Sequence, residues 1–173
     1  FNMCDDGLHE ISNPSELFLN ERTQNNTPGS VIIATNEGSR PLLIEIQALV
    51  GTTSYPSPRR VSNGIDYNRL LQILAVLEKR IGLNLSKQDV YVNVIGGLEI
   101  DEPAADLGVA LAVATCARDV CVSPDTVIVG EIGLSGEIRA INNLDKRIKE
   151  SEKLGFKKII VPQTNTLKKE EFK

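Results

Sequence analysis

The sequence predicts an α/β (α+β) mixed-sheet sandwich, and three observations lead to this prediction. Short β-branched and apolar segments alternate with helical patterns along the chain. Two of these segments, Val31–Thr35 and Leu42–Val50, flank a turn and predict a hairpin. The run from Ala104 to Ala117 is small and apolar on almost every side, which is typical of a buried central helix. Strands and helices in this alternation pack as layers around one core.

The hairpin is followed by a predicted loop and a predicted helix. Residues 51–64 contain two prolines and an Asn-Gly pair, and we expect a long loop there. Residues 66–81 carry leucines at three- and four-residue spacing, which predicts a helix with one buried stripe. Gly82 is expected to end it. Arg69 and Lys79 are expected on the opposite, solvated side.

A strand over 90–95 leads to the central helix, and acidic residues gather where that helix begins. Pro103 suits the first helical turn, because the N–H that proline lacks would have no intrahelical partner there. Asp101, Glu102 and Asp106 place negative charge at the positive end of the helix. We interpret these carboxylates as helix caps and not as metal ligands.

The last third predicts a second hairpin, a helix and a strand. Residues 127–132 and 137–141 flank the turn Leu134-Ser135-Gly136. Residues 144–154 form an amphipathic pattern that Gly155 is expected to end. Residues 158–161 predict a final strand, which Pro162 stops.

Length and composition predict one domain of ordinary size. The chain has 173 residues, of which 41% are hydrophobic and 24% charged. We expect an N-terminal extension over residues 1–27, the folded domain over 28–162 and a frayed tail over 163–173. The sequence does not start with Met, so we expect a C-terminal piece of a longer protein. No apolar run reaches the roughly 20 residues that span a bilayer, and we expect a cytoplasmic location.

Several kinds of catalytic or metal site are disfavoured. There are three cysteines, an odd number, and none lies in a Cys-x-x-Cys pair, so we expect neither a disulfide framework nor a metal site in this chain. The single histidine, His9, lies in the polar N-terminal stretch, and we expect it at the surface rather than in a Ser–His–Asp triad. No G-x-x-x-x-G-K-[ST] loop is present, which argues against an ATP site of that type.

A local group of basic residues is the main candidate for nucleic-acid binding. The formal net charge is −4, so the chain as a whole is not a polybasic binder. Arg59 and Arg60 follow the two prolines of the predicted loop, and adjacent guanidiniums on a stiff loop can grip phosphates. Lys79 and Arg80 end the next predicted helix. The alternative is a solvated surface, with Lys79 and Arg80 matching the helix dipole.

Two segments resemble the proteolytic domain of the Lon protease family. They are Ile100-Asp101-Glu102-Pro103-Ala104-Ala105-Asp106 and the stretch from Val129 to Arg147. The family places a nucleophilic serine after the proline of the first segment and a lysine after the Leu of Asn-Asn-Leu in the second. Here these positions hold Ala104 and Asp145. The resemblance therefore implies a Lon-like fold that is catalytically degenerate and not an enzyme.

A rescued Ser/Lys-type peptidase is the less favoured alternative. Such a hydrolase needs a hydroxyl nucleophile and an unprotonated amine that takes its proton. Lys146 is the nearest amine to the degenerate position. One step along a helix turns a side chain by about 100°, so Lys146 does not simply replace the missing lysine.

Among Lon-like domains, the chain most resembles the C-terminal domain of the RadA/Sms family of bacterial DNA repair proteins. The matching segments cover roughly residues 3–162 and are Ile44-Glu45-Ile46-Gln47-Ala48-Leu49-Val50, Pro58-Arg59-Arg60, Asn63-Gly64-Ile65-Asp66-Tyr67-Asn68-Arg69-Leu70, Glu102-Pro103-Ala104-Ala105-Asp106-Leu107 and Gly130-Glu131-Ile132-Gly133-Leu134. An alanine at the position of the Lon nucleophile is typical of this family.

This resemblance implies a role within a larger motor. The parent protein would carry a four-Cys zinc motif and a RecA-like ATPase that uses ATP and magnesium, both upstream of Phe1. It would be a DNA-dependent ATPase that drives branch migration in recombinational repair as a hexameric ring. The present domain would support ring assembly and bind single-stranded or branched DNA, alongside recombinase or replication proteins and without a membrane. The alternative is a module that binds a protein or peptide in the former protease groove.

Overall fold

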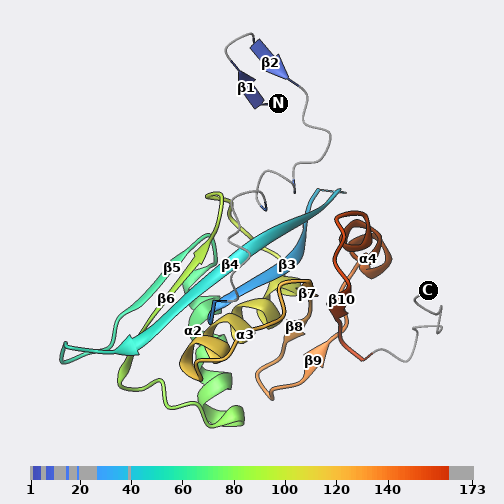
Figure 1. Ribbon diagram of the computed structural model, residues 1–173. Helices are drawn as coiled ribbons and strands as arrows, with labels where there is room; N and C mark the ends of the chain where they lie inside the picture. The colour runs from blue at the N-terminus through green and yellow to red at the C-terminus, as the bar shows by residue number, and fades with distance from the viewer. Residues whose placement is uncertain are drawn as a thin grey trace.

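The computed structural model describes residues 2–4, 7–9, 15, 19, 27–38 and 40–163. Its centre is a six-stranded mixed sheet in the order β10-β7-β3-β4-β6-β5 (Figure 1). Two smaller sheets of two strands each accompany it, β1 (Asn2–Cys4) with β2 (Gly7–His9), and β8 (Glu131–Ile132) with β9 (Ile138–Arg139). The mixed α/β class that the sequence predicts is confirmed.

The first predicted hairpin forms the centre of the sheet. Strands β3 (Ser30–Glu37) and β4 (Arg40–Thr52) pair antiparallel over eight residue pairs. Strand β6 (Gln88–Val94) pairs antiparallel with the far half of β4. The predicted long loop was only partly right, because it contains strand β5 (Arg60–Asn63), which runs parallel to β6 at the sheet edge. Four residues, three of them polar, are too short a signal to predict a strand.

The other end of the sheet is parallel. Strand β7 (Thr126–Ile128) pairs with β3, and β10 (Lys158–Ile160) pairs with β7. The predicted second hairpin is confirmed in part. Its turn joins β8 to β9, whereas residues 126–128 belong to the main sheet.

The helices lie on both faces of the sheet. Helix α2 (Tyr67–Val76) begins at Asp66, whose carboxylate accepts the Arg69 backbone N–H at 2.8 Å. It continues as a π-helical turn, η1 (Leu77–Ile81), which Gly82 ends in the left-handed conformation as predicted. A short 3-10 turn, η2 (Pro103–Ala105), leads into the central helix α3 (Asp106–Ala117), and α4 (Leu144–Lys153) follows β9.

Two buried clusters divide the core. The inward face of β4 and β6 packs on α2 and α3 in the larger cluster, and Figure 1 shows these two helices together beneath the sheet. The smaller cluster lies on the other face, where Ile32, Leu43 and Val127 meet residues of α4 and β10. Helix α3 approaches β3 so closely that a Cβ on Gly108 would lie 2.1 Å from the Ile33 Cγ2 atom. The helix is central and buried, as the sequence predicts.

Two sequence predictions extend beyond the described residues. The predicted tail over 163–173 has only Gln163 within them, and most of the predicted extension over 1–27 also lies outside. These boundaries stay predictions. In the described part of the chain, no helix is long and apolar enough to cross a membrane.

Candidate functional site

The position of the Lon nucleophile lies in a groove at the start of α3. Ala104 is buried in the η2 turn, and its carbonyl accepts the Gly130 N–H at 2.9 Å. A groove of about 380 Å³ runs past it between the β3–β4 turn and the start of α4. Its lining residues include Asn36, Glu102, Asn143 and Arg147. The fold therefore brings the two Lon-like segments to one groove, with a methyl group at the nucleophile position.

Arg147 is a buried residue that lines this groove. It is only 1% exposed, although its neighbours Asp145 and Lys146 are exposed and lie outside the groove lining. Its guanidinium makes two parallel 2.7 Å bonds to the Glu102 carboxylate and donates to the carbonyls of Ala34 and Asn142. This is the bidentate arrangement that suits arginine and carboxylate. A fixed ion pair thus stands beside the site of the missing catalytic dyad.

The same contacts set the protonation of Glu102. Burial by itself would raise the pKa of this carboxyl group. The hydrogen bonds from Arg147, Thr35 and the Asn36 backbone outweigh burial and hold the pKa of Glu102 below its ordinary value. Glu102 is therefore an ionised structural partner and not a general acid at neutral pH.

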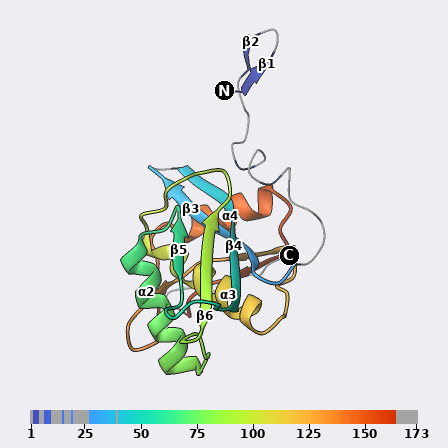
Figure 2. The same cartoon turned by 90° about the vertical axis from the view of Figure 1, so that its left-hand side faces the viewer.

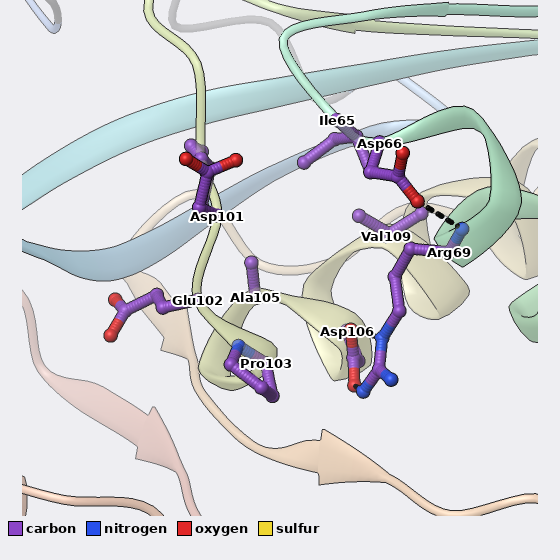
Figure 3. A pocket seen from close by; sticks show the side chains of 10 residues that line it. Ile65, Asp66, Arg69, Asp101, Glu102, Pro103, Ala105, Asp106 and Val109 are labelled. Carbon is purple, nitrogen blue, oxygen red and sulfur yellow. Dashed lines mark hydrogen bonds and ion pairs between the residues drawn. The ribbon is translucent and has the colours of Figure 1, made fainter.

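A second ion pair lies on the other side of the η2 turn. Arg69 on α2 reaches Asp106, which is buried at the first turn of α3 (Figure 3). Its Nε atom donates to Oδ1 at 2.8 Å, and the other carboxylate oxygen also accepts the Ile132 N–H at 3.0 Å. The hydrogen bond to Asp106 raises the pKa of Arg69. Beside the pair lies a pocket of about 200 Å³, and Figure 3 shows Glu102 pointing away from it.

Two predictions about these residues were wrong. Arg69 does not lie on a solvated face, because the turn of α2 that carries it also contacts α3. Glu102 and Asp106 do not cap a helix through their side chains. Instead, Arg147 forms an ion pair with Glu102, and Arg69 forms one with Asp106. Asp106 still lies in the first turn of α3, where the helix dipole favours negative charge.

Sequence reasoning gave Arg147 no role, although one signal was present. Leu144, Arg147, Ser151 and Leu154 follow each other at spacings of three, four and three residues, the pattern of a buried helical stripe. Arg147 and Ser151 are both buried in the structure. An arginine on a buried stripe predicts a paired, structural guanidinium.

The basic candidates Arg59 and Arg60 differ in their surroundings. Arg60 does not project from a loop as predicted. It begins β5, and its guanidinium donates to the carbonyls of Arg59, Leu85 and Gln88, with a 2.8 Å bond to Leu85. Arg59 is exposed, and its guanidinium carbon lies 3.6 Å from the centre of the Tyr55 ring. A hydrogen bond to the Tyr91 side chain raises the pKa of Arg59.

Lys79 and Arg80 lie in the last turn of η1. Both are exposed at the end of η1. Residues 82–87 then connect η1 to β6. The carbonyls of Leu85 in this connection and of Gln88 in β6 accept hydrogen bonds from Arg60. Arg80 lies against the β8–β9 turn, since a Cβ on Gly136 would be 3.0 Å from its Cγ atom. Figure 2 shows α2, β5 and β6 on the same side of the molecule. Arg59, Lys79 and Arg80 are therefore exposed cations, the first before β5 and the other two at the end of η1.

The described residues hold no group of three or more His, Cys, Asp or Glu side chains arranged to bind a metal ion.

Comparison with known proteins identifies the family. Residues 64–165 match the family described as subunit ChlI of Mg-chelatase. The chain belongs to this ChlI family. It is also similar to proteins named DNA repair protein RadA, with 55% identity over 166 residues in Synechocystis sp. and 48% over 165 residues in both Halalkalibacterium halodurans and Bacillus subtilis.

These matches cover nearly all of the chain but a minor part of each relative. They span 95–96% of this chain, and 33% of the Synechocystis protein or 36% of the other two. The chain thus spans about a third of the length of the relatives it matches. The resemblance to the C-terminal domain of RadA/Sms is confirmed, and this ChlI-family domain has the expected mixed-sheet fold.

Proposed function

We propose that this ChlI-family domain acts in DNA repair as a non-catalytic platform that binds DNA. The proposal rests on a contrast between the arginines near Ala104, which are paired with carboxylates, and the exposed basic residues before β5 and in η1. At the groove, Ala104 offers no nucleophile, and Arg147 beside it and Arg69 on the other side of the η2 turn are paired with carboxylates. Arg59, Lys79 and Arg80 are exposed and do not form ion pairs with any acid of the described residues.

The name of the relatives supports the choice of DNA as ligand. They are called DNA repair proteins, and the basic group offers the chemistry that binds phosphates. Arg59 is the leading candidate because the Tyr55 ring and the Tyr91 hydroxyl hold its guanidinium in place while it remains exposed. Arg60 contributes indirectly, since its bonds to Leu85 and Gln88 hold the start of β5 on the 82–87 connection.

We further propose that the domain works within a hexameric ring of a RadA-type ATPase that drives branch migration. A ring repeats a weak basic surface six times, and phosphate contacts then add in affinity. In this proposal ATP, magnesium and zinc bind to parts of the parent protein outside this chain.

Salt-dependent DNA binding tests the proposal. We would compare the wild-type chain with the triple variant Arg59→Gln/Lys79→Gln/Arg80→Gln by fluorescence anisotropy on single-stranded and forked DNA. Losing three phosphate contacts should reduce the slope of log K against log salt by about 2 on single strands. The matched control Lys149→Gln/Lys153→Gln/Lys157→Gln removes the same charge from α4 and the segment after it. Equal losses in both triples, or none in the first, would refute the proposed site.

The groove at Ala104 supports one alternative, the binding of an extended peptide without cleavage. It persists with a volume of about 380 Å³, and a buried Asn36 Oδ1 atom at its edge has no hydrogen-bond partner. Fluorescent casein provides a direct test. Binding without turnover would support a peptide module, whereas cleavage that Lys146→Ala abolishes would establish a peptidase.

A further inference from the structure

A second cavity lies on the opposite side of the sheet from α2 and α3. The segment before β3 and the outward faces of β4 and β6 enclose about 460 Å³, and Pro28, Gln47, Tyr91 and Asn93 are among the lining residues. Helix α4 packs against β4 and β3 on this sheet face, near Leu43, whereas Leu49 farther along β4 is 63% exposed. The described residues that line this cavity do not include Arg59, Lys79 or Arg80. They do include Tyr91, whose side chain also hydrogen-bonds to Arg59.

The wall of this cavity contains a buried carboxylate. Glu45 on β4 is only 6% exposed and lines the cavity. Its Oε1 atom accepts both of its side-chain hydrogen bonds, from the Ser30 hydroxyl at 2.5 Å and from the Gln47 amide at 2.9 Å. Among the residues that the structure describes, no lysine or arginine pairs with it.

Glu45 lines the cavity, and side chains of the described residues engage only its Oε1 atom. Its second carboxylate oxygen accepts no hydrogen bond from the described residues, and it is not among the unpartnered atoms that are sealed inside the protein. A nearly buried carboxylate without a cation costs free energy, because its lost hydration is only partly replaced. A cationic ligand that enters the cavity would remove this cost.

The other lining groups favour a guanidinium over a simple ammonium. Gln47 donates its amide N–H to Glu45, which leaves its carbonyl oxygen as an acceptor, and Asn93 lies opposite Gln47 across the strands. Several acceptors around one carboxylate match the five N–H donors of arginine. Tyr91 offers an aromatic side chain beside them. Nucleic acid fits less well, since Glu45 is the only charged side chain among the described lining residues and would repel phosphates.

The rim of the cavity has the character of a protein interface. Leu49 and Val61 both pair with Tyr91 in the sheet and are 63% and 36% exposed. An arginine anchor within an apolar and aromatic rim is typical of interface hot spots. We propose that this cavity receives an arginine side chain from a protein partner, with Glu45 as its counter-ion. This inference does not depend on DNA binding.

NMR titration of the chain with N-acetyl-arginine amide tests this inference. The probe should shift the side-chain amide signals of Gln47 and Asn93 saturably, with Kd on the order of 1 mM for so small a ligand. The neutral isostere N-acetyl-citrulline amide should produce no saturable shift. Glu45→Gln should weaken binding of the arginine probe at least tenfold, and the exposed control Glu37→Gln should leave it unchanged.

Urea unfolding separates binding from a structural role. If Glu45 is an unsatisfied carboxylate that awaits a cation, Glu45→Gln should unfold at the same or a higher urea concentration than wild type. A lower midpoint, equal binding of citrulline, or arginine shifts that persist in Glu45→Gln would overturn the assignment. A response to guanosine monophosphate in place of arginine would overturn it in favour of nucleic acid. Self-association that only Glu45→Gln abolishes, seen by sedimentation, would replace the external partner with a second copy.

Discussion

The segment around Pro103 and the segments β5 and η1 both involve arginines, but in different electrostatic settings. Arg147 and Arg69 reach carboxylates on either side of Pro103, and each pair has at least one deeply buried member. Arg59 before β5 and Lys79 and Arg80 in η1 remain exposed, whereas Arg60 binds backbone carbonyls. Buried charges are costly unless paired, whereas exposed charges remain available to a ligand. Proximity to the positions that match the Lon dyad therefore does not show which cations are available to a ligand.

The strongest test of this comparison is Arg147→Met. It leaves Glu102 without its cation in a partly buried site, and we expect a loss of about 3–5 kcal/mol in the free energy of unfolding. Urea denaturation followed by circular dichroism measures this loss. The exposed neighbour Lys146→Met is the matched control and should change stability by less than about 0.5 kcal/mol. Adding Glu102→Leu to Arg147→Met should recover part of the loss, and a further loss would contradict the assignment of the pair.

Arg69→Ala should have the next largest effect. It removes two charge-assisted bonds to buried Asp106, and we expect a loss of about 2 kcal/mol because Arg69 itself is partly solvated. The exposed residue Gln72 on the same helix provides the control variant Gln72→Ala. If both variants unfold at the same urea concentration, the Arg69–Asp106 pair does not stabilise the fold.

The two neighbouring arginines at β5 should respond differently to substitution. Arg60→Ala removes three bonds to backbone carbonyls, and we expect a loss of about 1–2 kcal/mol. Arg59→Ala removes an exposed cation–π contact and should change stability less than Arg60→Ala does. Chemical denaturation of both variants measures the difference. The reverse order of stabilities would break the distinction between a structural Arg60 and an available Arg59.

The pH dependence of the Glu102 contribution should be the smallest effect. The folded pKa of Glu102 lies below its ordinary value, so its ionised form stabilises the protein above the unfolded pKa of about 4.3. That stabilisation should disappear as the pH falls through the folded pKa. Unfolding free energies of wild type and Glu102→Gln should therefore converge between pH 5 and pH 3. A constant difference over this range would show that the charge of Glu102 is not what stabilises the fold.

Local patterns predicted the parts of the fold that depend on neighbouring residues. The leucine spacing and Gly82 predicted one helical segment over 66–81, which the structure divides into α2 and the π-helical turn η1, and the apolar run after Pro103 predicted α3. The segments that match RadA gave the family. The 60–63 strand could not be predicted in this way, because its four residues become a strand only by pairing with β6, about 30 residues away.

The sequence alone determined the class of fold, the order of its principal elements and the absence of a serine and a lysine from the Lon positions, since each of these follows from residue type or short-range spacing. The tertiary structure decided which charged side chains form ion pairs. Glu102 and Arg147 are 45 residues apart, and Arg69 and Asp106 are 37 apart, so no local pattern joins them. Burial and pairing are properties of the packed layers, and they separate the structural arginines from those left for a ligand.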